Sequence, residues 1–329
     1  MGKKYYEEID ILKGIAIAMV ILGHAIIRFP INLHEVAWTN ALYDWVETTH
    51  MPLFFMVSGF CFSYRGKYGE YIIKKIKRIL IPFLLFNLID CVPRSILPSL
   101  VNRPKPISES IRDIVLYGGE YWFLYALFLI FLFFPALSGI MKNKTVQVVV
   151  VALCVVLKFV PVLPEMFLIK RTCYHLLYFV IGYVLKQYFS IEGSIKVIES
   201  KKAVFGIAII GLSCIWVAVI PFYVVEHVQY LGIPLAFIGI TWSYLITVLV
   251  LKGRVRKLFA GFGKYSLQLY LLNGFTLVAS RTFTIKILHC SIPAVIVAIN
   301  MAIDLFVSYL IIKYILARFK VTKIACGIV

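Results

Sequence analysis

Residues 11–29 begin Ile-Leu-Lys-Gly-Ile-Ala-Ile-Ala-Met-Val-Ile-Leu-Gly-His and form a nearly continuous apolar run. A helix needs about twenty mostly apolar residues to cross the hydrocarbon core of a membrane. Two ionisable side chains, Lys13 and His24, interrupt this run, and Arg28 lies at its end. Because such side chains are costly inside a bilayer, they usually face a partner or a cavity and mark functional positions. The run therefore predicts a membrane-spanning helix that carries part of a functional site.

The composition of the whole chain favours a membrane protein. Of 329 residues, 61% are hydrophobic and only 15% are charged, and the mean hydropathy is +0.91. A soluble domain is about half apolar and about a quarter charged, so a soluble fold could not bury this much apolar surface. The net charge of +18 could indicate nucleic acid. Because the basic residues lie in short segments between apolar runs, we expect membrane lipids and no nucleic acid as partners.

The seven cysteines indicate no metal site. They show neither a C-x-x-C pair nor another metal-type spacing, and most lie in or beside apolar runs, where cysteine acts as a small hydrophobe. Disulfide bonds stay open for Cys91, Cys173 and Cys290, although nothing in their spacing favours one.

Ten apolar runs are long enough to be membrane spans, so the sequence predicts an all-α integral membrane protein with about ten transmembrane helices. Most of the 34 Lys and Arg residues fall on one side if the N-terminus is cytoplasmic. Cytoplasmic loops carry an excess of these residues, so both termini are expected in the cytoplasm and the protein in the inner (cytoplasmic) membrane. The predicted runs are 11–29, 44–64, 76–97, 120–141, 145–163, 171–189, 203–222, 230–251, 265–285 and 291–317.

The connections between these runs are short, and the longest is expected to be a loop over about 98–119. No connection is long enough for a soluble catalytic domain, and no internal repeat is visible. We therefore expect residues 1–329 to form a single transmembrane domain with its chemistry among the helices or at their ends.

The first two runs bring several polar residues to related depths. Lys13 and His24 are eleven residues apart, so on a helix they share a face and lie roughly 16 Å apart along the axis. The second run is expected to return from the outside, which places His50 near the depth of His24. Glu47 precedes His50 by three residues and could orient its imidazole, as a carboxylate does for a catalytic base. A structural hydrogen-bond network, with Lys13 reaching the inner interface beside Asp10, remains the alternative.

A basic segment precedes the third run. On a helix, Lys75 and Arg78 share a face at its inner end, where they could clamp phosphate or merely fix the topology. A basic inner end and a histidine site nearer the outside suit a ligand with phosphates at one end and a reactive group at the other. Coenzyme A thioesters have this form.

These motifs resemble those of the membrane-bound acyltransferase-3 family, and the resemblance covers nearly the whole chain. The most specific pieces lie in the first two runs, as Asp10-Ile-Leu-Lys-Gly with Gly23-His24, and as His50-Met-Pro-Leu-Phe-Phe-Met-Val-Ser-Gly-Phe. Weaker pieces are Lys75-Ile-Lys-Arg78-Ile-Leu-Ile-Pro-Phe, Tyr121-Trp-Phe-Leu-Tyr-Ala, Tyr178-Phe-Val-Ile-Gly-Tyr and Phe262-Gly-Lys-Tyr-Ser-Leu-Gln-Leu-Tyr.

The resemblance implies transfer of an acetyl or other short acyl group from cytoplasmic acyl-CoA to a glycan or another acceptor. His24 matches the family's essential histidine. Lys13 replaces the family's usual arginine and so lacks the planar guanidinium group that binds phosphate through two N–H groups. Lys75 and Arg78 match a basic pair of the family. Asn273 stands where many relatives carry a histidine, so it receives no catalytic role. Many members also carry an extracytoplasmic esterase-like domain, and this chain is expected to be the stand-alone form.

The sequence therefore predicts an acyl-CoA-dependent O-acyltransferase, with acetyl-CoA as the expected donor and no metal. The acceptor is expected to be a hydroxyl of a surface glycan or lipid-linked sugar, so the protein would modify cell-envelope polysaccharide. A transporter or flippase for such a sugar is the main alternative, and an inactive sensor or assembly partner is a third. The oligomeric state stays open. The expected catalytic residues are His24, as a buried general base, with His50 and Glu47. Lys13, Lys75 and Arg78 would bind the donor, and Asp44, Glu120, Trp122 and Tyr125 would bind the acceptor.

Overall fold

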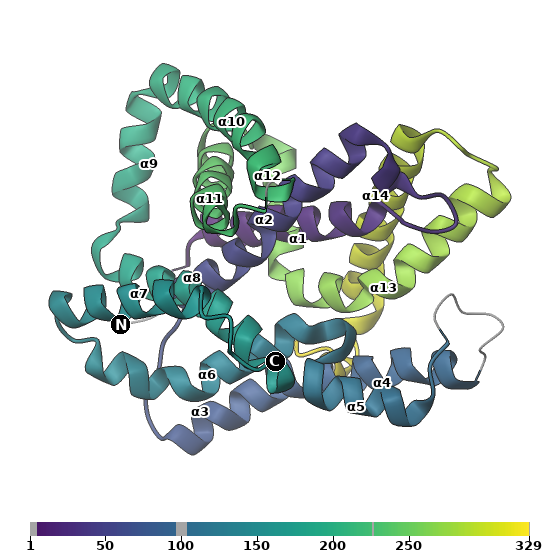
Figure 1. The fold of residues 1–329 in the computed structure, drawn as a ribbon, viewed down its shortest axis with the longest axis horizontal. Helices are drawn as coiled ribbons and strands as arrows, with labels where there is room; N and C mark the ends of the chain where they lie inside the picture. The colour runs from purple at the N-terminus through teal and green to yellow at the C-terminus, as the bar shows by residue number, and fades with distance from the viewer. Residues whose placement is uncertain (1–4, 97–103, 226, 329) are drawn as a thin grey trace. The chain divides into compact units, whose positions relative to one another are not determined.

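The structure is a computed structural model that describes residues 5–96, 104–225 and 227–328. Within these ranges every regular element is a helix (Figure 1). The predicted all-α class is therefore confirmed. Part of the expected 98–119 connection, residues 98–103, lies outside the described residues.

All ten predicted runs are largely helical. Five helical segments are also long and apolar enough to cross a membrane by themselves: Tyr68–Ile96, Ile107–Ile140, Lys202–Val224, Gln229–Leu249 and Pro293–Leu316. These segments support an integral membrane protein, while the count of ten and the cytoplasmic termini stay predictions. The helices that match the runs are α1 (Glu7–Ala25), α2 (Ala37–Phe60), α4 (Ile81–Ile96), α6 (Trp122–Ile140), α7 (Lys144–Lys158), α8 (Ile169–Tyr188), α10 (Lys202–Val224), α11 (Gly232–Leu249), α13 (Ser266–Thr282) and α14 (Pro293–Ile311).

The structure adds shorter helices in the connections, and one of them corrects a prediction. Helix α5 occupies Ile107–Tyr117, inside the stretch expected to be a loop. It is amphipathic, with Ile114 buried, and it ends at Gly118, whose φ of 76° is the left-handed conformation that glycine adopts at helix ends. The other short helices are α3 (Tyr68–Lys75), α9 (Ile191–Ser200), α12 (Gly253–Lys264) and α15 (Lys320–Ala325).

The chain divides into two compact units. Unit 1 comprises Met1–Val57 and Leu185–Lys313, and α1 packs there against α11, α12, α13 and α14. The contact with α12 is unusually close, because a Cβ atom at Gly14 would collide with the backbone carbonyl of Phe259. A Cβ at Gly263 would likewise collide with the carbonyl of Asp10. The two glycines thus let the backbones touch, as small residues do between membrane helices.

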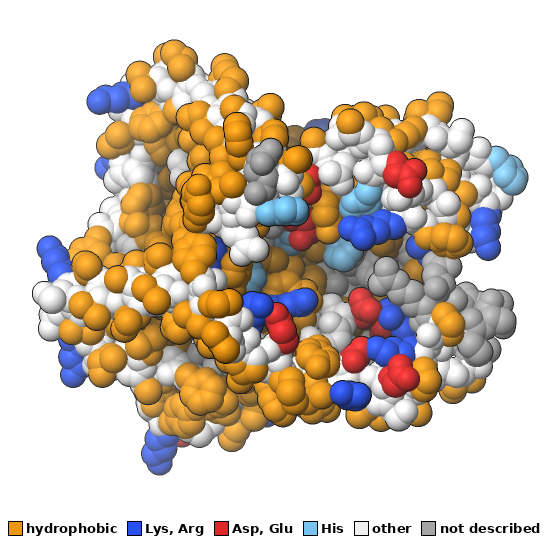
Figure 2. Space-filling view, in the orientation of Figure 1, with side chains coloured by type: hydrophobic (Ala, Val, Ile, Leu, Met, Phe, Trp, Pro, Cys, Tyr) orange, Lys and Arg blue, Asp and Glu red, His pale blue; other side chains and the backbone are white. Residues whose placement is uncertain are grey.

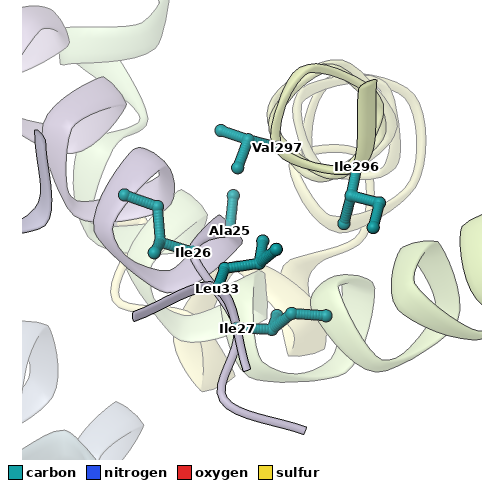
Figure 3. Packing of buried hydrophobic residues seen from close by; sticks show 6 residues of the cluster. All are labelled: Ala25, Ile26, Ile27, Leu33, Ile296 and Val297. Atoms are coloured by element: carbon teal, nitrogen blue, oxygen red, sulfur yellow. The ribbon is translucent and has the colours of Figure 1, made fainter. Parts of the chain in front are cut away.

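An apolar cluster fixes the chain where it leaves α1. Ala25, Ile26 and Leu33 are each no more than 2% exposed. They pack with Ile296 and Val297 from the beginning of α14 (Figure 3). This packing holds the end of α1 and the following 3-10 turn (Leu33–Glu35), which lead into α2.

Unit 2 comprises Ser58–Val184 and Tyr314–Val329. Its core is aromatic: the Phe62 ring lies within 6.4 Å, between centroids, of the rings of Phe131, Phe134 and Phe179. A Cβ at Gly59 would collide with the carbonyl of Phe179, so the end of α2 lies directly against α8 in this unit.

Large hydrophobic side chains are widely exposed, and they form broad areas on the face shown in Figure 2. In α10, only 11% of the most apolar stretch is buried inside the protein. A soluble protein rarely exposes such large apolar areas, whereas a protein surrounded by lipid does not need to bury them. The surface therefore agrees with the hydropathy of the sequence.

Candidate functional site

His24 lies one residue before the end of α1, and its side chain is exposed although both neighbours, Gly23 and Ala25, are buried. The sequence led us to expect a buried histidine, and the structure differs on this point. Almost every residue of α1 after Asp10 is covered by other helices, whereas the side chain of His24 is not covered. An imidazole there can meet a substrate without a rearrangement of the helix.

Glu47 of α2 lies beside the His24 turn. A Cβ at Gly23 would lie 3.2 Å from Val46 Cγ2 and 3.6 Å from Glu47 Oε1, so the absence of a side chain lets α1 and α2 approach. The Glu47 side chain is 47% exposed, and its carboxyl interacts electrostatically with His24. His24 of α1 and Glu47 of α2 therefore form one exposed acid and base pair.

His50 lies about one turn further along α2 and is only 4% exposed. Its Nδ1 lies 2.5 Å from the carbonyl oxygen of Val46, and because a carbonyl only accepts, Nδ1 carries the hydrogen. Its Nε2 lies 3.9 Å from Glu47 Oε1, which is too long for a hydrogen bond. The backbone of Val46 thus orients the His50 ring, and Glu47 stands at the level of His24.

Sequence reasoning missed a polar network at the beginning of α2, near the His24 and Glu47 pair. His34 Nε2 lies 3.0 Å from the carbonyl oxygen of Ile26, and His34 Nδ1 lies 3.3 Å from Asn40 Oδ1. The Asn40 amide nitrogen in turn donates to Asp44 Oδ2 at 3.0 Å. Because His34 also interacts electrostatically with Asp44 and Glu47, the network positions both carboxyls. Its sequence signal was a histidine in the connection between the first and second runs, ten residues before Asp44.

Lys13 is held by an ion pair at the other end of α1. Its Nζ lies 3.0 Å from Asp10 Oδ1, and the Tyr5 hydroxyl donates to the second oxygen of Asp10 at 2.9 Å. The Lys13 side chain is 28% exposed, so a ligand can still reach it. The pairing of Lys13 with Asp10 is the alternative that the sequence left open. A role of Lys13 in donor binding stays a prediction.

Lys75 and Arg78 lie in unit 2 at a change of helix type. Lys75 ends α3, and Arg78 lies in a π-helical turn over Ile76–Leu80. The extra residue in such a turn changes the spacing, so the α-helical rule that placed both cations on one face does not apply. The Lys75 Nζ lies 3.5 Å from the centre of the Phe131 ring, while Arg78 is exposed. Phosphate binding by this pair stays a prediction.

The three acceptor residues predicted in unit 2 have different surroundings. Glu120 is 51% exposed and lies 2.9 Å from Arg94 in an ion pair. The Trp122 ring stacks on His175, with 5.6 Å between centroids, and Tyr125 lies 5.4 Å from the Phe83 ring. None of these contacts tests acceptor binding, which stays a prediction.

The ten predicted site residues divide equally between the units. The structure joins His24, Glu47, Asp44 and His50 into one polar cluster at neighbouring turns of α1 and α2, which we call the His24 cluster. Lys13 lies at the other end of α1. Unit 1 holds His24, His50, Glu47, Lys13 and Asp44, and unit 2 holds Lys75, Arg78, Glu120, Trp122 and Tyr125.

The sequence analysis also missed Asp304, which is fully buried in α14. Its Oδ1 accepts hydrogen bonds from the hydroxyls of Thr276 and Ser308. An aspartate inside an apolar run was a visible signal, because ionisable residues in membrane spans are rare and usually have a function. Among the described residues, no group of three or more His, Cys, Asp and Glu side chains is arranged to hold a metal ion.

The fold and the His24 cluster define a helical membrane protein with an exposed imidazole beside a carboxylate. Comparison with known families identifies the class, because the acyltransferase-3 family, described as an acyltransferase domain, matches residues 6–317. The chain belongs to this family. The match runs through both units.

Two curated relatives are nodulation proteins called NolL. The protein from Mesorhizobium japonicum is 26% identical over 158 residues, which cover 46% of this chain and 41% of the relative. The protein from Sinorhizobium fredii is 24% identical over 182 residues, which cover 54% of this chain and 48% of the relative. The chain thus spans less than half the length of either relative. No solved structure matches it.

Proposed function

We propose that this acyltransferase moves an acetyl or other short acyl group from cytoplasmic acyl-CoA to a hydroxyl of a surface glycan or lipid-linked sugar, with His24 as the general base. The observation that carries the proposal is the exposed His24 imidazole on an otherwise covered helix, beside the carboxyl of Glu47. A base must reach the proton that it removes, and this position allows contact with a substrate hydroxyl.

In this mechanism the neutral His24 imidazole removes the proton from the acceptor hydroxyl. The hydroxyl oxygen of the acceptor attacks the thioester carbonyl at the same time. The carbon–sulfur bond then breaks, and the thiolate of CoA leaves with the proton that the imidazolium returns. Glu47 stabilises the positive charge that develops on His24 during the attack. The products are an acyl ester of the acceptor and free CoA, so no other reactant is needed.

The remaining residues receive supporting roles. Asp44, held by Asn40 and His34, offers a carboxyl group that can accept hydrogen bonds from sugar hydroxyls. Lys13, Lys75 and Arg78 supply positive charge for the phosphates of CoA. Glu120, Trp122 and Tyr125 contact the acceptor in unit 2.

The test uses purified protein, radiolabelled acetyl-CoA and a membrane extract of the producing cells as the source of acceptor. Wild-type protein should form a labelled product, and His24→Ala should lower the rate by about 10²- to 10⁴-fold, the usual contribution of a general base. Circular dichroism and the elution volume of the variant check its fold. Turnover retained in a folded His24→Ala protein would reject the proposed base, and no acetyl-CoA-dependent product from the wild type would favour a transporter.

A further inference from the structure

A row of cationic and aromatic side chains lies in unit 2, and apart from Trp122 its members have no role in the proposed reaction. It connects the end of α7 with the beginnings of α6 and α8. His175 stands in the middle, with 5.0 Å between its ring centre and that of Tyr174 and 5.6 Å to Trp122. The row ends in one cation on each side, Lys158 beside Tyr174 and Arg171 over Trp122. We call these five residues, together with Tyr178, the Lys158–Arg171 cluster.

Lys158 is the buried cation of this cluster, with only 8% of its surface exposed. Its Nζ donates a hydrogen bond of 2.6 Å to the Tyr178 hydroxyl and lies 3.7 Å from the centre of the Tyr174 ring. Ring faces attract an ammonium group, but they only partly replace the water that it has lost. A buried cation normally has an anion as its partner.

No protein carboxylate supplies that anion in the described part of the chain. The two acids nearest to the cluster in sequence pair with other cations: Glu120 lies 2.9 Å from Arg94, and Glu165 lies 2.8 Å from Lys170. Lys158 and Arg171 have no ion pair with any described residue. Among the described residues, neither basic side chain of the cluster is therefore paired with a carboxylate.

Arg171 gives the cluster a binding geometry as well as a charge. Its Cζ atom lies 5.1 Å from the centre of the Trp122 ring, and the His175 ring stacks on the same indole. Contact with the indole restrains the guanidinium and reduces the freedom that binding would cost. The residue is exposed, so its N–H groups can bind two oxygens of a phosphate or carboxylate at once.

We propose that the Lys158–Arg171 cluster is a binding site for an oxyanion, a phosphate or carboxylate group, carried by a molecule with a hydrocarbon part. Arg171 binds the oxyanion through its paired N–H groups, and the charge of Lys158 strengthens the positive potential at the same end of the helices. The exposed apolar surface around this end, including Val162, Met166 and Phe167, suits the hydrocarbon part. Lys158 and Arg171 have no role in the proposed acyl transfer, so the proposed reaction can fail without affecting binding of the oxyanion.

Thermal unfolding of the purified full chain in a neutral detergent tests the site. Decyl phosphate should raise the unfolding midpoint with a saturable dependence on concentration, whereas decyl glucoside, which has the same chain without charge, should not. In Arg171→Gln the apparent affinity for decyl phosphate should fall by about tenfold or more, as expected for loss of a charge-assisted bidentate contact. Arg171→Lys keeps the charge but loses the planar guanidinium, so its affinity for decyl phosphate should lie between those of the wild type and Arg171→Gln.

Lys170→Gln is the matched control, because this neighbouring cation already pairs with Glu165. Its affinity for decyl phosphate should equal that of the wild type. Decanoate and inorganic phosphate distinguish the sources: binding of decanoate indicates a carboxylate ligand, and strong binding of inorganic phosphate indicates a free anion instead of a lipid headgroup. An equal shift with decyl glucoside, or an equal loss in Lys170→Gln and Arg171→Gln, would overturn the proposal.

Discussion

The two polar clusters of this protein differ in the sign of their charges. In the His24 cluster of unit 1, carboxyl groups of Asp44 and Glu47 stand beside histidines. In the Lys158–Arg171 cluster of unit 2, two cations stand among aromatic rings with no carboxylate partner in the described residues. An acid beside an imidazole suits the movement of a proton, and cations without acids suit the binding of an anion. The comparison separates a reacting site from a binding site, and single substitutions can test this separation.

Among substitutions that leave both His24 and His50 in place, the largest effect is expected at Glu47. Glu47→Gln keeps the size of the side chain but removes the charge that supports the His24 imidazolium, so kcat should fall on the order of 100-fold. The measurement is the initial rate with saturating labelled acetyl-CoA. Glu35→Gln is the control, because Glu35 is an exposed carboxylate in the same region that hydrogen-bonds to Asn32. Equal losses in the two variants would show that general negative charge, and not the pairing with His24, matters.

The next effect concerns stability in unit 2. Tyr178→Phe removes the hydroxyl that accepts the Lys158 hydrogen bond and leaves a buried ammonium without this partner. The free energy of unfolding should fall by about 1–3 kcal/mol, while the turnover of folded protein should stay the same. Tyr230→Phe, at a side chain that is 67% exposed, should leave stability unchanged in the same denaturant titration. A large loss of kcat in folded Tyr178→Phe would break the separation between the two clusters.

A smaller effect is expected where α1 meets α2. Gly23→Ala adds a Cβ 3.2 Å from Val46 Cγ2, so Val46 of α2 must shift by a few tenths of an ångström. This shift moves His24 relative to Glu47, and kcat should fall by about fivefold. Gly211→Ala on α10 is the control, because nothing lies within 4 Å of its new Cβ. Unchanged kinetics in Gly23→Ala would mean that the close approach of the helices does not set the geometry of the pair.

The smallest effect is expected at Lys13. Because Lys13 is partly exposed and already paired with Asp10, Lys13→Ala should raise the KM for acetyl-CoA by only about threefold and leave kcat unchanged. Lys196→Ala removes an exposed lysine from α9 and should not change the KM. A fall in kcat without a change in KM would place Lys13 in the chemical step.

Hydropathy predicted the long helices because a membrane span must be continuously apolar. It missed α5, α9 and α12, since short amphipathic helices alternate polar and apolar residues and leave no such run. The close contact of α12 with α1 had a sequence signal in Gly14, but its partner Gly263 could not be identified without the fold. The division into two units also depends on contacts between distant segments, which no local pattern contains.

The candidate site was only partly predictable for a similar reason. The sequence pointed to His24 and Glu47. The position of α2 along α1, however, depends on the turn from Ile26 to Val36, which joins the two helices. That turn places Glu47, and not His50, beside the His24 turn. Lys158 lies inside the predicted run 145–163, and only its packing against α8 shows that its side chain is buried beside Tyr178.

The central claim is that His24, and not His50, moves the proton during acyl transfer. The most direct measurement is the single-turnover rate of labelled acetyl transfer in His24→Gln and His50→Gln, both purified and shown to be folded. The account predicts a loss of about 10²-fold or more in His24→Gln. His50→Gln should keep most of the rate, because the His50 ring is buried and bound to the carbonyl of Val46. A normal rate in His24→Gln, or a greater loss in His50→Gln, would contradict the account.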